Sequence, residues 1–111
     1  MRQLDLKYPT CPIRNILSRF SDKWSLLILC SLEACETMRY KDLNKNIPDI
    51  SQKVLSGTLK RLVEDRLIVR KVYAEVPPRV EYSLTDMARE IMPAIQIMIG
   101  WAQQHFDEIV E

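Results

Sequence analysis

The sequence predicts a mainly α-helical domain with one small β-hairpin, an α+β fold, and two observations support this prediction. Four largely apolar or amphipathic stretches each follow a residue suited to start a helix: Pro12, Asp22, Ser51 and Thr85. Between the last two stretches lie two runs of strand-forming residues, separated by a pair of prolines. With 111 residues, 47% of them hydrophobic and 28% charged, residues 1–111 are predicted to form one domain with one core.

The first two helices are expected in the N-terminal third of the chain. Pro12 suits the first turn of a helix that runs to about Phe20, with Thr10 or Cys11 as its cap. Asp22 is the expected cap of the next helix, KWSLLILCSLEA, which is apolar nearly all round. The second helix is therefore predicted to be central and buried.

Two further helices are predicted in the middle of the chain, separated by a short turn. Residues 38–40 are expected to be extended, and residues 41–47 to form a short helix that Pro48 stops. Ser51 has the chemistry of an N-cap for a helix over about residues 51–65.

The helix that begins at Ser51 is predicted to have two unlike faces. At 100° per residue, one face gathers aliphatic side chains, with Val63 at its margin: Val54, Leu55, Leu59 and Leu62. The other face is small, polar and mostly basic: Lys53, Ser56, Gly57, Lys60 and Glu64. Glycine costs a helix about 0.5–1 kcal/mol relative to alanine. A partner that approaches closely would explain Gly57, and so would helix packing or sequence drift.

The hairpin is expected to begin directly after this helix, over about residues 67–84. Residues 67–76 form its first strand, and residues 79–84 form a half-buried second strand with alternating apolar side chains. Pro77 and Pro78 between them make a stiff turn that has no backbone N–H to donate.

The last helical segment is expected over about residues 85–110, with a kink or a restart at Pro93. Its apolar residues cover well over half of the circumference, which is more than one small core requires. Burial in a symmetric homodimer is the commonest solution. The alternative is a helix that packs more deeply into its own core.

Charge is distributed unevenly along a chain whose net charge is only +1. Residues 39–61 hold six cationic and two acidic side chains, a net charge of +4, whereas residues 83–111 hold one and five, a net charge of −4. This asymmetry favours an anionic partner for the middle of the chain. A solvated face without a partner is the commoner origin of such a run.

The middle helices, joined by Pro48-Asp49-Ile50, and the hairpin behind them together predict a winged helix-turn-helix that binds double-stranded DNA. The prolines at the tip are expected to hold Arg79 out toward a groove or a phosphate. The predicted DNA contacts lie on the second helix of the motif and at the wing tip: Ser51, Gln52, Lys53, Ser56, Gly57, Lys60, Arg61 and Arg79.

Three segments carry a resemblance to a known family: KWSLLIL (23–29), PDISQKVLSGTLKRL (48–62) and YAEVPPRVEYSLT (73–85). They resemble the HxlR-type winged-helix transcriptional regulators of bacteria, and the likeness extends from Cys11 to about His105. The resemblance implies a homodimeric DNA-binding regulator with its recognition helix at about 51–65 and its N- and C-terminal helices in the dimer interface. A symmetric dimer requires an inverted-repeat operator. On the C-terminal helix, the expected interface residues are Ile95, Met98, Trp101 and Phe106.

The chain departs from the family pattern after the recognition helix, where Asp65-Arg66 replaces the usual glycine. If Arg66 adopts a left-handed conformation there, the cost is about 1 kcal/mol.

A thiol response is a further implication of the resemblance. Some members of the family sense oxidants or electrophiles through a cysteine just ahead of the first helix, and Cys11 matches that position. A helix N-terminus favours the thiolate, so we expect Cys11 to react before Cys30. An inert Cys11 is equally compatible with the sequence.

Other classes of function are disfavoured. Three cysteines without a CxxC pair and one histidine make a poor zinc set, and no glycine-rich phosphate loop or cofactor motif is present, so we expect no metal, no cofactor and no enzyme. No apolar run reaches membrane length and no signal peptide is evident, which predicts a cytoplasmic protein. A protein-interaction module without DNA binding is the main alternative, and a small-molecule effector remains open.

Overall fold

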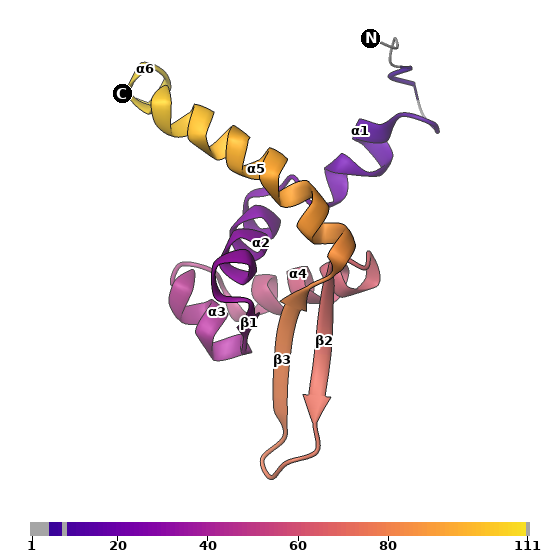
Figure 1. Cartoon of the computed structure of the whole chain (residues 1–111), viewed down its shortest axis with the longest axis vertical. Helices are drawn as coiled ribbons and strands as arrows, with labels where there is room; N and C mark the ends of the chain where they lie inside the picture. The colour runs from indigo at the N-terminus through magenta and orange to yellow at the C-terminus, as the bar shows by residue number, and fades with distance from the viewer. Residues whose placement is uncertain (1–4, 8, 111) are drawn as a thin grey trace.

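Helices and strands follow one another in the predicted order in the computed structural model, which describes residues 5–7 and 9–110 (Figure 1). The elements are α1 (Pro12–Asn15), η1 (Leu17–Arg19), α2 (Lys23–Cys35), β1 (Thr37–Met38), α3 (Tyr40–Asn46), α4 (Gln52–Glu64), β2 (Ile68–Tyr73), β3 (Arg79–Leu84), α5 (Asp86–Gln104) and α6 (Phe106–Ile109). The mainly α fold with a small sheet is confirmed.

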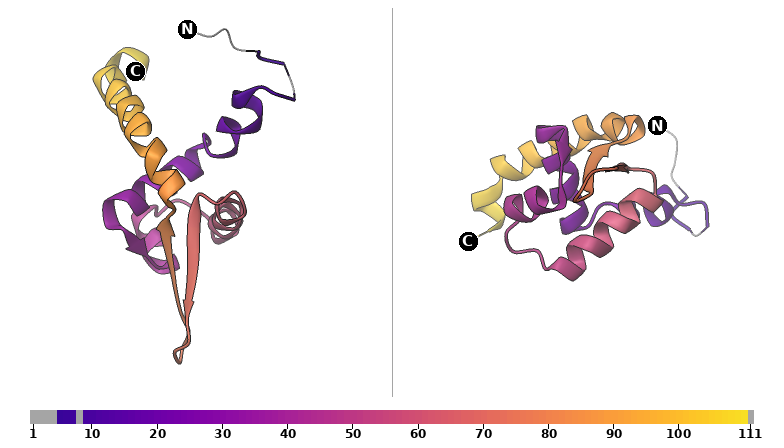
Figure 2. Two further views of the ribbon diagram at one scale, coloured as in Figure 1. Left: turned by 45° about the vertical axis from the view of Figure 1, so that its right-hand side comes forward. Right: turned by 90° about the horizontal axis from the view of Figure 1, so that it is seen from below.

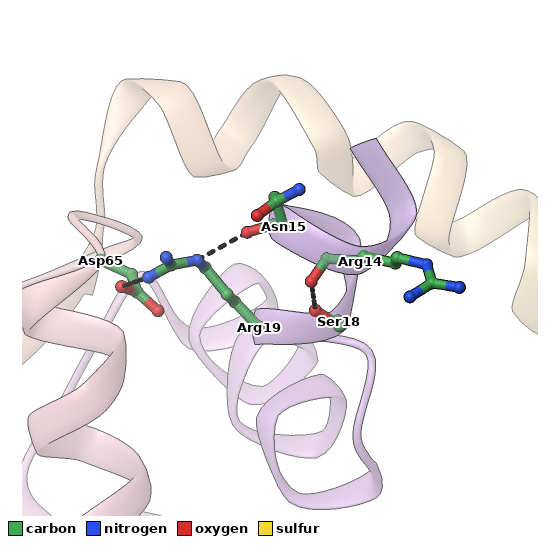
Figure 3. Close-up of polar contacts among 5 residues, drawn as sticks. All are labelled: Arg14, Asn15, Ser18, Arg19 and Asp65. Carbon is green, nitrogen blue, oxygen red and sulfur yellow. Dashed lines mark hydrogen bonds and ion pairs between the residues drawn. The ribbon is translucent and has the colours of Figure 1, made fainter. Parts of the chain in front are cut away.

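The prediction of one continuous helix up to Phe20 is wrong, because the helix breaks at Ile16. A four-residue α-helix is followed there by a tighter 3₁₀ turn. Side chains bond to carbonyls near the break: the Ser18 hydroxyl donates to Arg14 O at 2.6 Å, and Arg19 Nε donates to Asn15 O at 2.7 Å (Figure 3). Helix ends commonly meet their hydrogen-bonding needs in this way.

Arg19 also ties this N-terminal segment to the end of α4. Its guanidinium lies 2.8 Å from the carboxylate of Asp65, which is largely buried (Figure 3). Partial burial reduces the screening of such a pair by water. The first helical segment is therefore linked to the C-terminal end of α4.

The central helix is α2, which packs against β3, α3, α4 and α5. Its predicted cap is confirmed, since the Asp22 carboxylate accepts a hydrogen bond from the Ser25 N–H at 3.1 Å. Ile28, Leu29 and Leu32 are fully buried in the core. Burial all round is not observed, because Leu27 remains exposed.

The helix-turn-helix consists of α3, α4 and the turn between them. Two isoleucines of the turn, Ile47 and Ile50, are buried and anchor it to the core. Ser51 caps α4 as predicted, with its hydroxyl accepting from Val54 N–H at 3.1 Å. Burying the turn fixes the angle between the two helices.

The sheet has three antiparallel strands in the order β1-β3-β2. The short extended piece expected at residues 38–40 is β1, which begins one residue earlier and ends two residues earlier, at Met38, and Met38 pairs with Tyr82. The hairpin pairs Ile68–Tyr73 with Arg79–Leu84, so its first strand ends three residues before the predicted Val76. Beyond its base the hairpin projects from the body of the molecule as a wing (Figures 1 and 2).

A Schellman motif joins α4 to the wing. Leu67 N–H donates to Leu62 O at 2.9 Å and Arg66 N–H donates to Val63 O at 3.0 Å. Arg66 adopts the left-handed conformation that its position requires, with φ of 62°. The Thr85 hydroxyl donates to Arg66 O at 2.8 Å, which fixes the base of the hairpin.

The last helix, α5, begins at its predicted cap, where Thr85 accepts from Ala88 N–H at 3.1 Å. No restart occurs at Pro93, because α5 continues through it to Gln104. Pro93 and Arg89 both lie on the exposed side, where water can replace the missing N–H donor. The interruption lies instead at His105, ahead of α6.

Two segments extend from the body on the side opposite to the wing tip: α1 on one side, and α6 with the C-terminal part of α5 on the other (Figure 1). Both ends carry exposed apolar side chains: Ile13, Ile16, Leu17, Ile97, Met98, Trp101, Phe106 and Ile109. Among the described residues, no helix combines the length and the apolar character that crossing a bilayer requires.

Candidate nucleic-acid interface

The outer face of α4 is open to solvent, as the sequence predicted. The exposed residues on this face are Ser51, Gln52, Lys53, Ser56, Gly57 and Lys60. The opposite face is buried in the core through Leu55, Thr58, Leu59 and Leu62. The helix therefore presents backbone N–H groups, hydroxyls, an amide and two lysines in one place.

The predicted boundary of the buried face was wrong at two positions. Val54 is exposed, and Thr58 is buried in its place. The buried residues follow the spacing i, i+3, i+4, i+7 from Leu55, and Val54 lies one step outside that stripe. Periodicity located the face, and packing fixed its edge.

Gly57 lies in the middle of the exposed face. A Cβ added there would meet no atom within 4 Å. Packing within the described chain therefore does not require a glycine at this position. Of the explanations that the sequence left open, a close partner and sequence drift remain.

Arg61, which the sequence placed among the DNA contacts, is engaged within the protein. Its guanidinium donates to Asp22 at 3.2 Å and to the Ser25 hydroxyl at 2.9 Å. These bonds tie α4 to the N-terminal turn of α2. Arg61, named among the predicted DNA contacts, thus has partners within the protein in this conformation.

The contacts with Ser25 and Arg61 change the pKa of Asp22. Desolvation acts to raise its pKa, but the hydrogen bonds from Ser25 and the charge of Arg61 outweigh that effect. The pKa of Asp22 consequently lies below its ordinary value.

Arg79 is also engaged, and the expectation that the wing tip holds it outward is wrong for this conformation. Its guanidinium lies 3.2 Å from Glu75 and 3.6 Å from Glu81. It also lies over the ring of Tyr73, 3.9 Å from the centroid. Val76 at the tip, in contrast, is fully exposed.

A cation that the sequence analysis missed, Arg70, lies on the wing beside α4. Arg70 lines a groove of about 420 Å³ together with Ser56 and Lys60 of α4. Tyr40 of α3 lines the same groove, and its hydroxyl donates to Gln52 O at 3.2 Å. Arg70 pairs with Tyr82 across the hairpin, and this register turns the Arg70 side chain toward α4. No sequence motif marked this cation.

Comparison with known proteins identifies the family to which the chain belongs. The model of the HxlR-like helix-turn-helix family matches residues 19–110. The chain belongs to this family. An HTH-type transcriptional regulator of Methanothermobacter thermautotrophicus is 36% identical over 95 residues, which cover 86% of this chain and 72% of the relative.

Solved structures agree with this assignment. The redox regulator HypR in its reduced form superposes with a TM-score of 0.82 at 30% identity, over 88% of this chain and 96% of HypR. The reduced transcriptional regulator YodB from B. subtilis gives a TM-score of 0.74 at 33% identity, over 86% and 93% of the two chains. The HxlR-like chain is thus a winged-helix transcriptional regulator of the DNA-binding type, and the relatives named here are regulators, not enzymes.

The residues expected in the dimer interface of this HxlR-like protein have different surroundings. Ile95 is only 1% exposed and packs in its own core, so its assignment to an interface between subunits is wrong. Met98, Trp101 and Phe106 are each more than half exposed. Trp101 lies against the ring of His105, with 4.9 Å between the ring centroids. These three exposed side chains remain available to a partner.

The three thiols of the HxlR-like chain also differ in their surroundings. Cys11 caps α1 through its backbone, but its side chain is only 1% exposed, so early reaction is not favoured in this conformation. Cys35 is exposed. Partial burial of Cys30 and the nearby negative charge of Glu33 raise the pKa of the Cys30 thiol. Among the described residues, no group of three or more His, Cys, Asp or Glu side chains is placed to hold a metal ion.

Proposed function

We propose that this protein binds an inverted-repeat operator as a homodimer, with α4 of each subunit in the major groove of double-stranded DNA. The observation that carries the proposal is the exposed face of α4, which displays Gln52, Lys53, Ser56 and Lys60 around Gly57. Apart from Ser56 and its 3.4 Å contact with the Tyr40 hydroxyl, these side chains make no hydrogen bond or ion pair within residues 5–7 and 9–110. These side chains are therefore available to bind a partner outside the chain.

The chemistry of this face suits the two kinds of contact that DNA recognition needs. The amide of Gln52 and the hydroxyl of Ser56 can bond to base edges, which discriminate sequence by about 1–3 kcal/mol each. Lys53, Lys60 and the N-terminus of α4 suit phosphates, which give affinity without sequence preference. Two such helices in a symmetric dimer require half-sites about 10 bp, or a multiple of it, apart.

The exposed apolar residues of the two chain ends support the homodimer. Met98 and Trp101 lie on α5, Phe106 lies on α6, and Ile13 and Ile16 lie on α1 and at its end. An apolar surface of this kind is characteristic of an interface. Because α1 and the α5–α6 segment lie opposite the wing tip, dimerisation through them would leave both wing tips free (Figure 1).

Binding to DNA is tested with genomic fragments in a titration at several salt concentrations. A DNA-binding regulator loses affinity steeply as salt rises. Gln52→Ala and Ser56→Ala should relax sequence preference by about 1–3 kcal/mol, and Lys60→Ala should weaken all sequences alike. Arg89→Ala, an exposed cation on α5, serves as the matched control and should change neither property. Salt-independent or absent binding would favour a protein-interaction module instead.

A thiol response through Cys11 is a second, dependent proposal. Its position just ahead of Pro12 matches the family pattern, and the redox regulator HypR is among the similar structures. Because Cys11 is buried, an oxidant must act on a conformation in which the thiol is exposed. Loss of the oxidant effect on DNA affinity in Cys11→Ser, but not in Cys35→Ser, would support the proposal. An unchanged oxidant response in Cys11→Ser would reject it.

A further inference from the structure

The wing has two faces with different chemistry, which the strand register defines. Arg70 pairs with Tyr82, so both lie on the face turned toward α4. Lys71 pairs with Glu81, and Tyr73 pairs with Arg79, so these four lie on the opposite face. The side chains of the two faces are therefore separated by the hairpin itself.

The face turned away from α4 is neutral and internally paired. Arg79 is held by Glu75 and Glu81 at 3.2 and 3.6 Å and lies over the ring of Tyr73. Lys71 Nζ approaches the same ring, 4.9 Å from its centroid. Drawing Arg79 out to a phosphate would leave two carboxylates beside a polyanion, which like-charge repulsion opposes. The tip is therefore poorly suited to phosphate binding.

The face turned toward α4 has the opposite character. Lys60 and Arg70 line the groove between α4 and the wing, and neither forms an ion pair in the part of the chain that the structure describes. The hydroxyl-bearing residues Ser56 and Tyr40 also line the groove. Both hydroxyls donate within the protein, Tyr40 to Gln52 O and Ser56 to the Tyr40 hydroxyl, so the two cations, unpaired among the described residues, are the groups that would bind phosphodiester oxygens.

We propose that the groove between α4 and β2 holds the DNA sugar-phosphate backbone through Lys60 and Arg70, and that Arg79 stiffens the wing tip instead of contacting phosphate. The inference rests on the proposed DNA binding and specifies where the backbone runs. It assigns Arg70 a role that no sequence pattern indicated. It also places Ser56 at the edge of two surfaces, the α4 face and the groove.

Replacing Glu64 should have the opposite effect on DNA affinity from replacing Lys60 or Arg70. Its carboxylate lines the same groove and forms no ion pair among the described residues. A negative charge there repels a phosphate. Glu64→Gln should therefore tighten DNA binding, roughly twofold to threefold at moderate salt. A variant that merely disturbed the fold would weaken binding.

The test measures the affinity of full-length variants for a fluorescein-labelled random-sequence duplex across a series of salt concentrations. Arg70→Ala and Arg70→Gln should each weaken binding roughly threefold to tenfold and lower the slope of log affinity against log salt by about 0.9. Lys60→Ala should do the same. Arg70 and Lys60 are exposed, and a thermal melt of each variant establishes that it is folded.

A charge-matched control separates the groove from the wing tip. The double variant Arg79→Gln with Glu81→Gln removes one positive and one negative charge, and its salt slope should equal that of the wild type. A slope lowered by about 0.9 in this variant, or an unchanged slope in both Arg70 variants, would overturn the inference. If Gln52→Ala still relaxed sequence preference in that case, the proposed function would stand. If the wild type bound no duplex at all, the proposed function would fail, and the inference with it.

Discussion

At the scale of single residues, replacing Gly57 tests protein stability and DNA binding in one variant. A Cβ there would meet no other atom of the described residues within 4 Å, so Gly57→Ala should stabilise α4 by about 0.5–1 kcal/mol. The same methyl group would stand in the middle of the face proposed to approach the DNA. We expect DNA affinity to fall roughly tenfold, about 1.4 kcal/mol, while the midpoint of thermal unfolding rises. Unchanged affinity in the more stable variant would mean that DNA does not approach Gly57 closely.

Arg61 provides the contrasting case of a cation used for stability. Arg61→Ala removes its bonds to Asp22 and Ser25 and should lower the free energy of unfolding at pH 7 by roughly 0.5–1 kcal/mol. It should leave the salt slope of DNA binding unchanged, unlike Lys60→Ala. A slope lowered by about 0.9 would instead return Arg61 to the DNA contacts.

The pKa of Asp22 predicts the pH dependence of this contribution. Because folding lowers the pKa, the contribution of Asp22 is complete above the unfolded value of about 3.9 and is lost as the pH falls through the folded value. The difference in unfolding free energy between the wild type and Asp22→Asn should therefore be constant from neutral pH to about pH 5 and shrink below about pH 4. Denaturant titrations at these pH values measure it. A difference that stayed constant to the lowest pH would contradict the assignment.

At the scale of elements, the junction of α4 and the wing is held together despite a residue that suits it poorly. Arg66 has φ of 62°, a conformation that costs a non-glycine residue about 1 kcal/mol. The Schellman bonds and the Thr85 hydroxyl hold it there. Arg66→Gly should raise the free energy of unfolding by up to about 1 kcal/mol, measured by denaturant titration. Because Arg66 itself makes no proposed DNA contact, a large loss of affinity in this variant would be unexpected and would point to a cation missed at the interface.

At the scale of the whole molecule, the chain is more extended than a compact domain of its length. Its radius of gyration is 16.0 Å, whereas about 13 Å is typical of 111 residues. The excess comes from the projecting wing and from two arms at the opposite end, α1 and α6 with the C-terminal part of α5 (Figures 1 and 2). Apolar side chains on the arms then lack a core of their own, which is the physical basis for the proposed dimer.

The dimer is tested by replacing a side chain that the monomer does not need. Trp101 is 58% exposed, so Trp101→Glu should leave the fold intact, weaken the dimer and weaken operator binding together. Ile97→Glu changes a second exposed position of α5, and its effect on the dimer is compared with that of Trp101→Glu. Light scattering at micromolar concentration measures the mass. A monomeric wild type at that concentration would contradict the proposal.

The sequence alone determined the order of the elements, the caps at Asp22, Ser51 and Thr85, and the exposed basic face of α4. These features depend on local hydrogen bonds and on periodicity, which neighbouring residues encode. Tertiary structure decided which cations are free. Arg61 and Arg79 are engaged by carboxylates, whereas Arg70 beside α4 forms no ion pair among the described residues. It also decided that Ile95 and Cys11 are buried. Which charge meets which partner depends on strand register and on residues distant in sequence, as between Arg61 and Asp22, and no local pattern contains that information.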